Sequence, residues 1–276
     1  MKQYLESLKH CLENGIDVKS RAGNVRKAFG YQMKFDLSKG FPAITTKKLA
    51  WKSVVSELLW FIEGSNDERR LAEILYDDVR ENLKDKKTIW TQNAEADYWK
   101  PKAKFYGDVG RIYGVQWRNF NGVDQLEELI RGIKNEPNSR RHIISAWNPA
   151  ELNQMSLPAC HAFSQFFISE NKLSCQLYQR SCDMFLGVPF NIASYSLFTH
   201  MLAEECNLQV GTFIHTLGDF HIYEEHFDQV KIQLSREPNN LPILEFKTKN
   251  FYKYNVNDFI LKGYNYHPKI EASMNV

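Results

Sequence analysis

The chain has 276 residues, a formal net charge of +2 and a hydrophobic content of 43%. A chain of this length and content can bury a sizeable core. The near-neutral charge argues against nucleic acid and membrane surfaces as partners, and no apolar run in the sequence approaches the roughly 20 residues that span a bilayer.

The cysteines and the start of the chain indicate the compartment. The five cysteines are widely spaced, and no pair has the spacing of a zinc site or a redox motif. The first residues lack the basic-then-apolar layout of a signal peptide. We therefore expect a reduced, cytoplasmic protein that binds no metal. Because no repeat or Gly/Ser linker interrupts the sequence, we also expect a single domain over residues 1–276.

Two helices are predicted in the first half of the chain. Apolar residues recur at helical spacing over residues 51–62, and Glu57 lies at the border of that stripe, next to Val54 and Phe61. A carboxylate in this position should be partly desolvated, which raises its pKa. Residues 63–108 are charged and predict a variable helical and loop excursion. The second helix is predicted over residues 123–133, before Pro137.

The second half of the chain combines strands and helices. Residues 142–147, 161–169 and 172–179 are predicted strands, the last two joined by a tight turn at Glu170 and Asn171. Asn191 is placed to begin a helix as its N-cap. A strand near residues 211–219 and a helix ending near Leu234 follow. Strands that alternate with helices predict an α/β (α+β) fold, in which helices pack on a mixed sheet.

One loop carries a candidate nucleophile. Cys160 follows Pro158, and the proline fixes φ and removes a backbone donor, so the loop cannot relax into a helix. Arg180 belongs to a neighbouring predicted strand region and is expected beside the sulfur. An adjacent cation favours the thiolate, which is the nucleophilic form of cysteine. The alternative for Cys160 is a small buried hydrophobe, as most free cysteines are.

The Cys160 loop is one of several motifs spread along the chain. The others lie at residues 1–4, 40–47, 57–61, 113–118, 139–141, 179–193, 218–223 and 274–276. In this order, the motifs resemble those of the thymidylate synthase family over nearly the whole chain. The resemblance implies that family's fold, a large mixed sheet with helices on one face. It also implies a homodimer in which the two sheets stack back to back.

The resemblance implies a reaction and a set of catalytic residues. The reaction converts dUMP and 5,10-methylenetetrahydrofolate, a co-substrate, to dTMP and dihydrofolate. Cys160 is implied to add to C6 of uracil, which makes C5 nucleophilic, and Arg180 to favour the thiolate. Asn191 suits the base, because its amide offers a donor to O4 and an acceptor to N3–H, whereas cytosine reverses both groups. The other implied catalytic residues are Glu57, Tyr113 and His161 for proton transfer, and Asp183.

Further residues are implied to bind the two substrates. Arginine forks match phosphate oxygens, and Arg140 and Arg141 are implied to reach the dUMP phosphate from the partner subunit. The alternative for this pair is a solvated turn. The implied nucleotide-binding set is Arg21, Arg140, Arg141, Arg180, Ser181, Cys182, Asp183, Asn191, His221 and Tyr223. The implied folate-binding set is Lys47, Glu57, Ile89, Trp90, Asp183, Leu186, Gly187, Phe190 and Asn275.

The sequence departs from the family pattern mainly on the folate side. Residues 22–26 and 91–93 differ from the common motifs, Arg111 stands in place of a proline and Leu217 in place of a glycine. These changes leave open a dUMP hydroxymethylase, in which water instead of hydride completes the reaction and gives 5-hydroxymethyl-dUMP. Trp90 favours hydride, because it matches a tryptophan that borders the folate in the family. A third alternative is a catalytically inactive homologue that binds nucleotide or RNA, against which the intact catalytic set argues.

Overall fold

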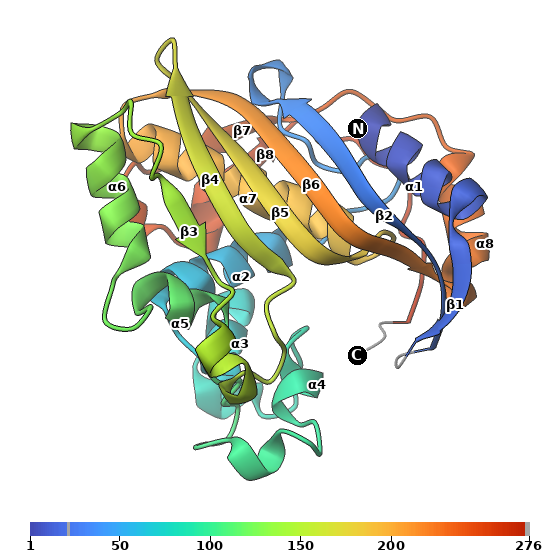
Figure 1. The fold of residues 1–276 in the computed structure, drawn as a ribbon, viewed down its shortest axis with the longest axis horizontal. Helices are drawn as coiled ribbons and strands as arrows, with labels where there is room; N and C mark the ends of the chain where they lie inside the picture. Colours follow the sequence, from blue (N-terminus) through green and yellow to red (C-terminus); the bar gives the residue numbers. More distant parts are fainter. Residues whose placement is uncertain (21–22, 274–276) are drawn as a thin grey trace.

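The computed structural model describes residues 1–20 and 23–273. Its main element is a six-stranded sheet with the strand order β1-β2-β6-β5-β4-β3 (Figure 1). The strands are β1 (Ile16–Ser20), β2 (Gly23–Asp36), β3 (Ile143–Ser145), β4 (His161–Ser169), β5 (Lys172–Asp183) and β6 (Gln209–Tyr223). Because β5 and β6 are parallel and the other neighbouring pairs are antiparallel, the predicted mixed sheet is confirmed.

Helices lie behind this sheet and at its edges (Figure 1), and a small second sheet pairs β7 (Ile243–Phe246) with β8 (Phe259–Lys262). The α-helices are α1 (Lys2–Asn14), α2 (Trp51–Glu63), α3 (Glu68–Tyr76), α4 (Thr91–Ala94), α5 (Tyr113–Arg118), α6 (Gln125–Asn135), α7 (Gly187–Glu205) and α8 (Phe227–Leu234). None of the helices among the described residues combines the length and apolar character needed to cross a membrane.

The core lies between the sheet and the helices behind it. Figure 1 shows α7 and α2 behind the sheet. Phe166 of β4 packs edge-on against Phe198 of α7, with ring centroids 5.7 Å apart. Both side chains are fully buried, as is Leu177 of β5. Helix α7 is apolar around most of its circumference, which is the pattern of a helix enclosed by its neighbours.

The opposite face of the sheet is uncovered over β4, β5 and β6, where Figure 1 shows no helix of the described residues. Side chains alternate between the two faces of a strand. In β4 and β5 the outward positions include Phe163, Phe167 and Tyr178, which are exposed. Phe163 and Tyr178 are register partners. An aromatic patch therefore lies on a sheet face that no helix of residues 1–20 and 23–273 covers.

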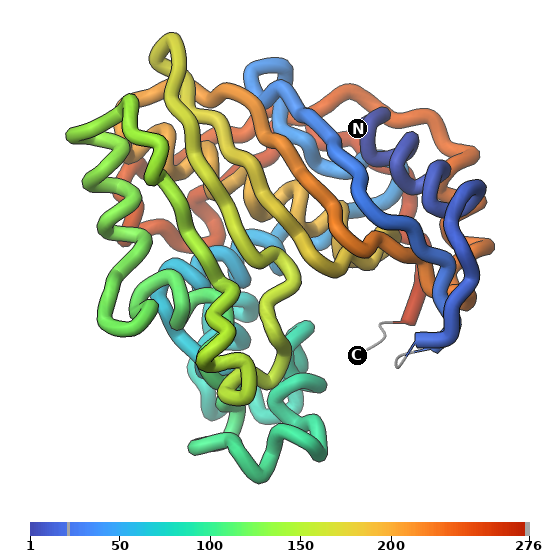
Figure 2. The backbone as a smooth tube through the Cα atoms, viewed as in Figure 1, coloured from blue at the N-terminus to red at the C-terminus, as the bar shows by residue number. Residues whose placement is uncertain are grey.

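Several local predictions are confirmed. The helix predicted over residues 51–62 is α2, and the helix predicted over 123–133 is α6. The turn between β4 and β5 lies at Glu170 and Asn171, whose φ values of 50° and 58° are those of a tight hairpin turn. The excursion of residues 63–108 contains α3 and α4, and Figure 2 shows it in teal, projecting below the sheet.

The prediction that Asn191 begins a helix as its N-cap is wrong. Helix α7 begins at Gly187, so Asn191 lies in its first turns. Pro189 is compatible with this start, because the first turn of a helix has no partner for its backbone N–H groups. The carboxylate of Asp183 accepts instead from the backbone N–H of Phe185 and of Leu186, at 3.0 and 3.2 Å. This turn directs the chain from β5 into α7.

Candidate active site

Cys160 directly precedes β4, beside β5. Its backbone N–H donates to Tyr113 Oη at 2.7 Å, and its carbonyl accepts from the backbone N–H of Arg180 at 2.8 Å. Tyr113 begins α5, so a helix and a strand both hold this one residue. The side chain is partly exposed. The loop after Pro158 thus presents the sulfur at a defined position.

Arg180 is oriented towards the sulfur, as the sequence predicts. Its Nη2 lies 3.8 Å from Cys160 Sγ, and its guanidinium donates to the carbonyl oxygens of Pro158 and Ala159 at 2.7 and 2.9 Å. Arg180 lowers the pKa of the Cys160 thiol, but burial raises it by more, so the pKa lies above its ordinary value. The thiol form is therefore favoured over the thiolate, and the cation only partly offsets the desolvation.

Glu57 is buried in α2, with 5% of its surface exposed. Its Oε1 accepts from the indole Nε1 of Trp90 at 2.7 Å. Burial raises the pKa of Glu57 to about 7, and the Trp90 hydrogen bond opposes this because it favours the ionised form. The expected desolvation of this carboxylate is confirmed. A group with such a pKa can take up and release protons near neutral pH.

Tyr113, His161 and Tyr195 form an aromatic cluster next to Cys160, in which Tyr195 meets His161 edge-on. The rings of Tyr113 and His161 are 3.9 Å apart and nearly parallel, and His161 Nδ1 lies 2.9 Å from Tyr195 Oη. Burial, with a contribution from His215, lowers the pKa of His161 to about 3. The imidazole is therefore neutral at pH 7. This neutral form is better suited to holding the neighbouring rings in position than to the proton transfer that the sequence implies.

Asn191 faces a chain of buried polar groups. Its Oδ1 accepts from Gln179 Nε2 at 3.1 Å, and Gln179 Oε1 lies 2.9 Å from His215 Nε2. With its oxygen held by Gln179, the Asn191 amide has a defined orientation. Sequence reasoning missed both Gln179 and Tyr195. A signal exists for Gln179, because it is polar at an inward position of β5 that continues the apolar series through Leu177.

The other predicted nucleotide-binding residues lie along β5 and β6, which run side by side. Asp183 pairs in register with His221, and His221 Nδ1 lies 3.3 Å from Asp219 Oδ1. The rings of His221 and Tyr223 are 5.4 Å apart. Cys182 differs, because its side chain is fully buried and its Sγ donates to Gln179 O at 3.3 Å. Cys182 therefore has no surface accessible to a ligand in this structure. Ser181 is partly exposed.

The predicted folate-binding residues are only partly accessible. Trp90 is 5% exposed and Ile89 is 39% exposed. Lys47 is buried, and its Nζ donates to Phe185 O at 2.5 Å and lies 3.6 Å from the Phe185 ring centroid. Burial lowers the pKa of Lys47 to about 7. A ligand would have to draw this amine out of its present position. The remaining members, Leu186, Gly187 and Phe190, are partly buried at the start of α7.

Some predicted residues do not join the centre around Cys160. Arg140 and Arg141 are exposed in the connection between α6 and β3, and neither makes an ion pair with any described residue. No ion pair or hydrogen bond among the described residues joins either arginine to Cys160 or Arg180. Arg21 and Asn275 lie outside the described residues.

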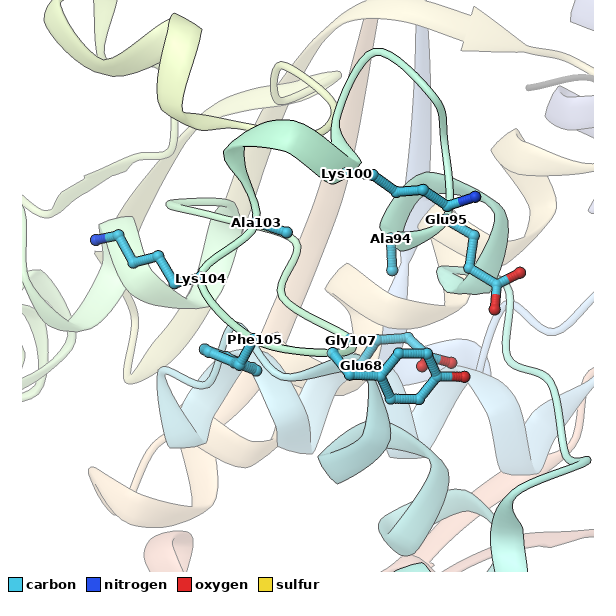
Figure 3. Close-up of a pocket in the computed structure, with 9 residues that line it drawn as sticks. Glu68, Ala94, Glu95, Lys100, Ala103, Lys104, Phe105 and Gly107 are labelled. Atoms are coloured by element: carbon cyan, nitrogen blue, oxygen red, sulfur yellow. The ribbon is translucent and has the colours of Figure 1, made fainter.

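A cavity of about 510 Å³ lies in the excursion of residues 63–108 (Figure 3). It is lined by Glu68 of α3, by Ala94 and Glu95 at the end of α4, and by Lys100 and residues 103–107. None of these residues belongs to the predicted site. We therefore take the centre around Cys160, and not this cavity, as the candidate active site.

The centre comprises the Cys160 thiol with Arg180 beside it, the buried Glu57 carboxylate, and the Asn191 amide oriented by Gln179. The model of the family described as thymidylate synthase matches residues 2–276. Because the match spans essentially the whole chain, the protein belongs to the thymidylate synthase family of dUMP-utilising one-carbon transferases.

Proposed function

We propose that the protein is a thymidylate synthase, which converts dUMP and 5,10-methylenetetrahydrofolate to dTMP and dihydrofolate. The observation that carries the proposal is the placement of Cys160 between two fixed partners. Tyr113 holds its backbone N–H, and the Arg180 guanidinium lies 3.8 Å from its sulfur. A nucleophile next to an orienting cation suits covalent catalysis on an electron-poor ring.

In the proposed reaction, the Cys160 thiolate forms a bond to C6 of dUMP, and the electron pair of the C5–C6 double bond moves towards O4. C5 then attacks the methylene carbon of the folate, as one of the two carbon–nitrogen bonds of that carbon breaks. Loss of the C5 proton and cleavage of the second carbon–nitrogen bond leave an exocyclic methylene on the base. Hydride from the tetrahydrofolate reduces this methylene, the folate becomes dihydrofolate, and the Cys160 sulfur leaves C6.

Glu57 and Asn191 have separate roles in this proposal. Glu57 exchanges protons with the base through water, for which a pKa of about 7 is suited. Asn191 reads uracil, and its held orientation supports this role because a mispaired cytosine would leave buried donors facing each other. An unmatched buried group costs roughly 1–3 kcal/mol. The residues matching the phosphate site are Arg180, Ser181, Arg21, Arg140 and Arg141.

A homodimer is part of the proposal. The exposed aromatic residues Phe163, Phe167 and Tyr178 lie on the uncovered face of the sheet, which supports a second copy of the sheet as the covering layer. The same arrangement supplies Arg140 and Arg141 to the partner's phosphate site. We also place the protein in the cytoplasm, a reducing compartment compatible with its five free cysteines.

The reaction is tested by product mass after incubation with dUMP and 5,10-methylenetetrahydrofolate. A thymidylate synthase adds CH₂ to the nucleotide, whereas a dUMP hydroxymethylase adds CH₂O, because water takes the place of hydride. Formation of only the heavier product would replace the first assignment with the second. The absence of both products would leave an inactive homologue.

Cys160 is tested directly by covalent trapping with 5-fluoro-dUMP and the folate. The wild-type protein should form a mass adduct, and Cys160→Ala should bind dUMP without forming it. Cys206→Ala is the matched control, because Cys206 is also a free, partly exposed cysteine. An adduct that persists in Cys160→Ala would overturn the proposed nucleophile.

A further inference from the structure

Glu68 is a buried carboxylate for which the proposed mechanism has no use. It is the first residue of α3 and is 2% exposed. Arg69, 4% exposed, pairs with it through two nitrogens, with Nε 2.6 Å from Glu68 Oε2. Burying such a pair is costly unless further hydrogen bonds satisfy the remaining groups. The partners of the pair therefore indicate what it holds in place.

The further partners of Glu68 flank Trp90. Thr88 Oγ1 and Thr91 Oγ1 both donate to Glu68 Oε1, at 2.7 and 2.6 Å. Each hydroxyl also accepts a backbone N–H. Thr88 Oγ1 accepts from Trp90 at 3.1 Å, and Thr91 Oγ1 accepts from Thr88 at 2.8 Å. One carboxylate oxygen of Glu68 thus holds both threonines of the turn that contains Trp90.

Arg69 attaches the preceding segment to the same point. Its Nη1 donates to the carbonyl oxygens of Leu83 and Lys86, at 3.1 and 2.9 Å. The cavity of Figure 3 borders Glu68 from the side of α4, Lys100 and residues 103–107. The Trp90 turn is therefore anchored to α3 by a buried hydrogen-bonded network of side chains.

We infer that Glu68, acting through Thr88 and Thr91, is a positioning residue that holds the Trp90 indole against Glu57. The inference rests on the proposed function for its catalytic consequence. A displaced indole would release the 2.7 Å hydrogen bond to Glu57 and open the folate side of the site to water. Thr91 is the residue after Trp90, and its hydroxyl donates to Glu68 of α3, so the carboxylate acts on Trp90 through the adjacent side chain.

Thr91→Val is the principal test, since valine keeps the shape of threonine and removes its hydroxyl. Glu68→Gln is less suitable, because it leaves the buried Arg69 guanidinium without its charge partner and is expected to unfold the protein. Thr91→Ser restores the hydroxyl. Thr199→Val is the matched control, because Thr199 is buried and its hydroxyl donates to Tyr195 O within α7.

The first measurement is independent of turnover. In protein labelled with ¹⁵N-tryptophan, the indole N–H signal of Trp90 is assigned with Trp90→Phe. We expect Thr91→Val to shift this signal and to speed its exchange with solvent. Thr91→Ser and Thr199→Val should leave it at the wild-type position. A wild-type indole signal in Thr91→Val would overturn the inference.

The second measurement is catalytic. In Thr91→Val we expect kcat/KM for the folate to fall about 10- to 100-fold, as for other small misplacements of a site, while KM for dUMP changes little. The fraction of product carrying CH₂O should rise, which a general loss of stability would not cause. Equal losses in Thr199→Val would contradict the inference. If wild-type protein forms no product but the indole responds as expected, the proposed function fails and the positioning of Trp90 stands.

Discussion

At the scale of single residues, burial of Glu57 lowers the stability of the protein near neutral pH and also gives the carboxylate a pKa suited to proton transfer. Its pKa is about 7 in the folded protein and near 4.5 in an unfolded chain. The folded state therefore binds more protons between these values, so the free energy of unfolding falls as pH rises from 4.5 through 7. The difference corresponds to roughly 3 kcal/mol. The site thus holds a carboxylate that is unfavourable in its charged form.

Glu57→Gln should therefore separate the two properties. At pH 8 we expect the variant to be more stable than wild type towards urea, by up to about 3 kcal/mol, with little difference at pH 4.5. Its kcat should be lower by about 100-fold or more, and the acidic limb of the pH profile near 7 should disappear. Glu63→Gln, at the end of the same helix, removes only an exposed ion pair with Arg70 and is the control. It should leave kcat and its pH profile unchanged and alter stability by less than about 1 kcal/mol. A retained acidic limb in Glu57→Gln would assign that limb to another group.

Asn191 is the residue that should set the choice of base. Asn191→Asp replaces the amide donor with a carboxylic group, which when protonated can pair with the reversed pattern of cytosine. We expect the ratio of kcat/KM for dUMP to that for dCMP to fall at least about 10-fold, from the cost of mismatching one buried group. Asn207→Asp, beyond the other end of α7, is the control. An unchanged ratio would contradict the base-reading role.

At the scale of elements, the crossing of α2 and α5 is tight at Gly114. A Cβ added there would lie 2.6 Å from Phe61 O and 2.7 Å from Phe61 Cα. The backbone of α2 cannot yield as a flexible side chain can, so α5 would have to move. Tyr113, the neighbouring residue, holds the backbone of Cys160.

Gly114→Ala is thus expected to lower stability by about 1–3 kcal/mol and to lower kcat/KM, through the displaced Tyr113. The control is Gly132→Ala in α6, where the nearest atoms belong to the His142 ring at 3.2 and 3.3 Å. We expect its stability to lie within about 1 kcal/mol of wild type, because alanine favours the helix. Thermal and urea unfolding of both variants measure the difference. Equal effects would show that the crossing is not specially constrained.

The elements also show how far the sequence predicts the structure. Helix α2 and the β4–β5 hairpin follow from local periodicity and turn residues, and both were predictable. Strand β2 was not, because its burial alternates irregularly and its partner β6 is distant in the chain. In the site, the residue types of Cys160 and Glu57 point to their chemistry. The contacts of Gln179 and Tyr195 depend on tertiary packing, which local patterns do not encode.

At the scale of the whole molecule, the site of one chain lacks two of its predicted arginines. Arg140 and Arg141 are exposed between α6 and β3, without an ion pair to any described residue, while Arg180 lies at Cys160. In a two-fold symmetric dimer, a patch on one chain meets the partner at an equivalent place. Two chains related in this way can complete each other's phosphate site, and the aromatic face of β4 and β5 offers a surface for the association.

A mixed dimer tests this arrangement. Subunits carrying Cys160→Ala are combined with subunits carrying both Arg140→Ala and Arg141→Ala, each inactive as a homodimer. If the arginines act across the interface, every mixed dimer has one site with an intact cysteine and intact arginines. Random mixing should then recover about a quarter of the wild-type activity. Isolating mixed dimers with two different affinity tags verifies their composition. If the arginines act within their own chain, each site carries one defect, and verified mixed dimers show no recovery.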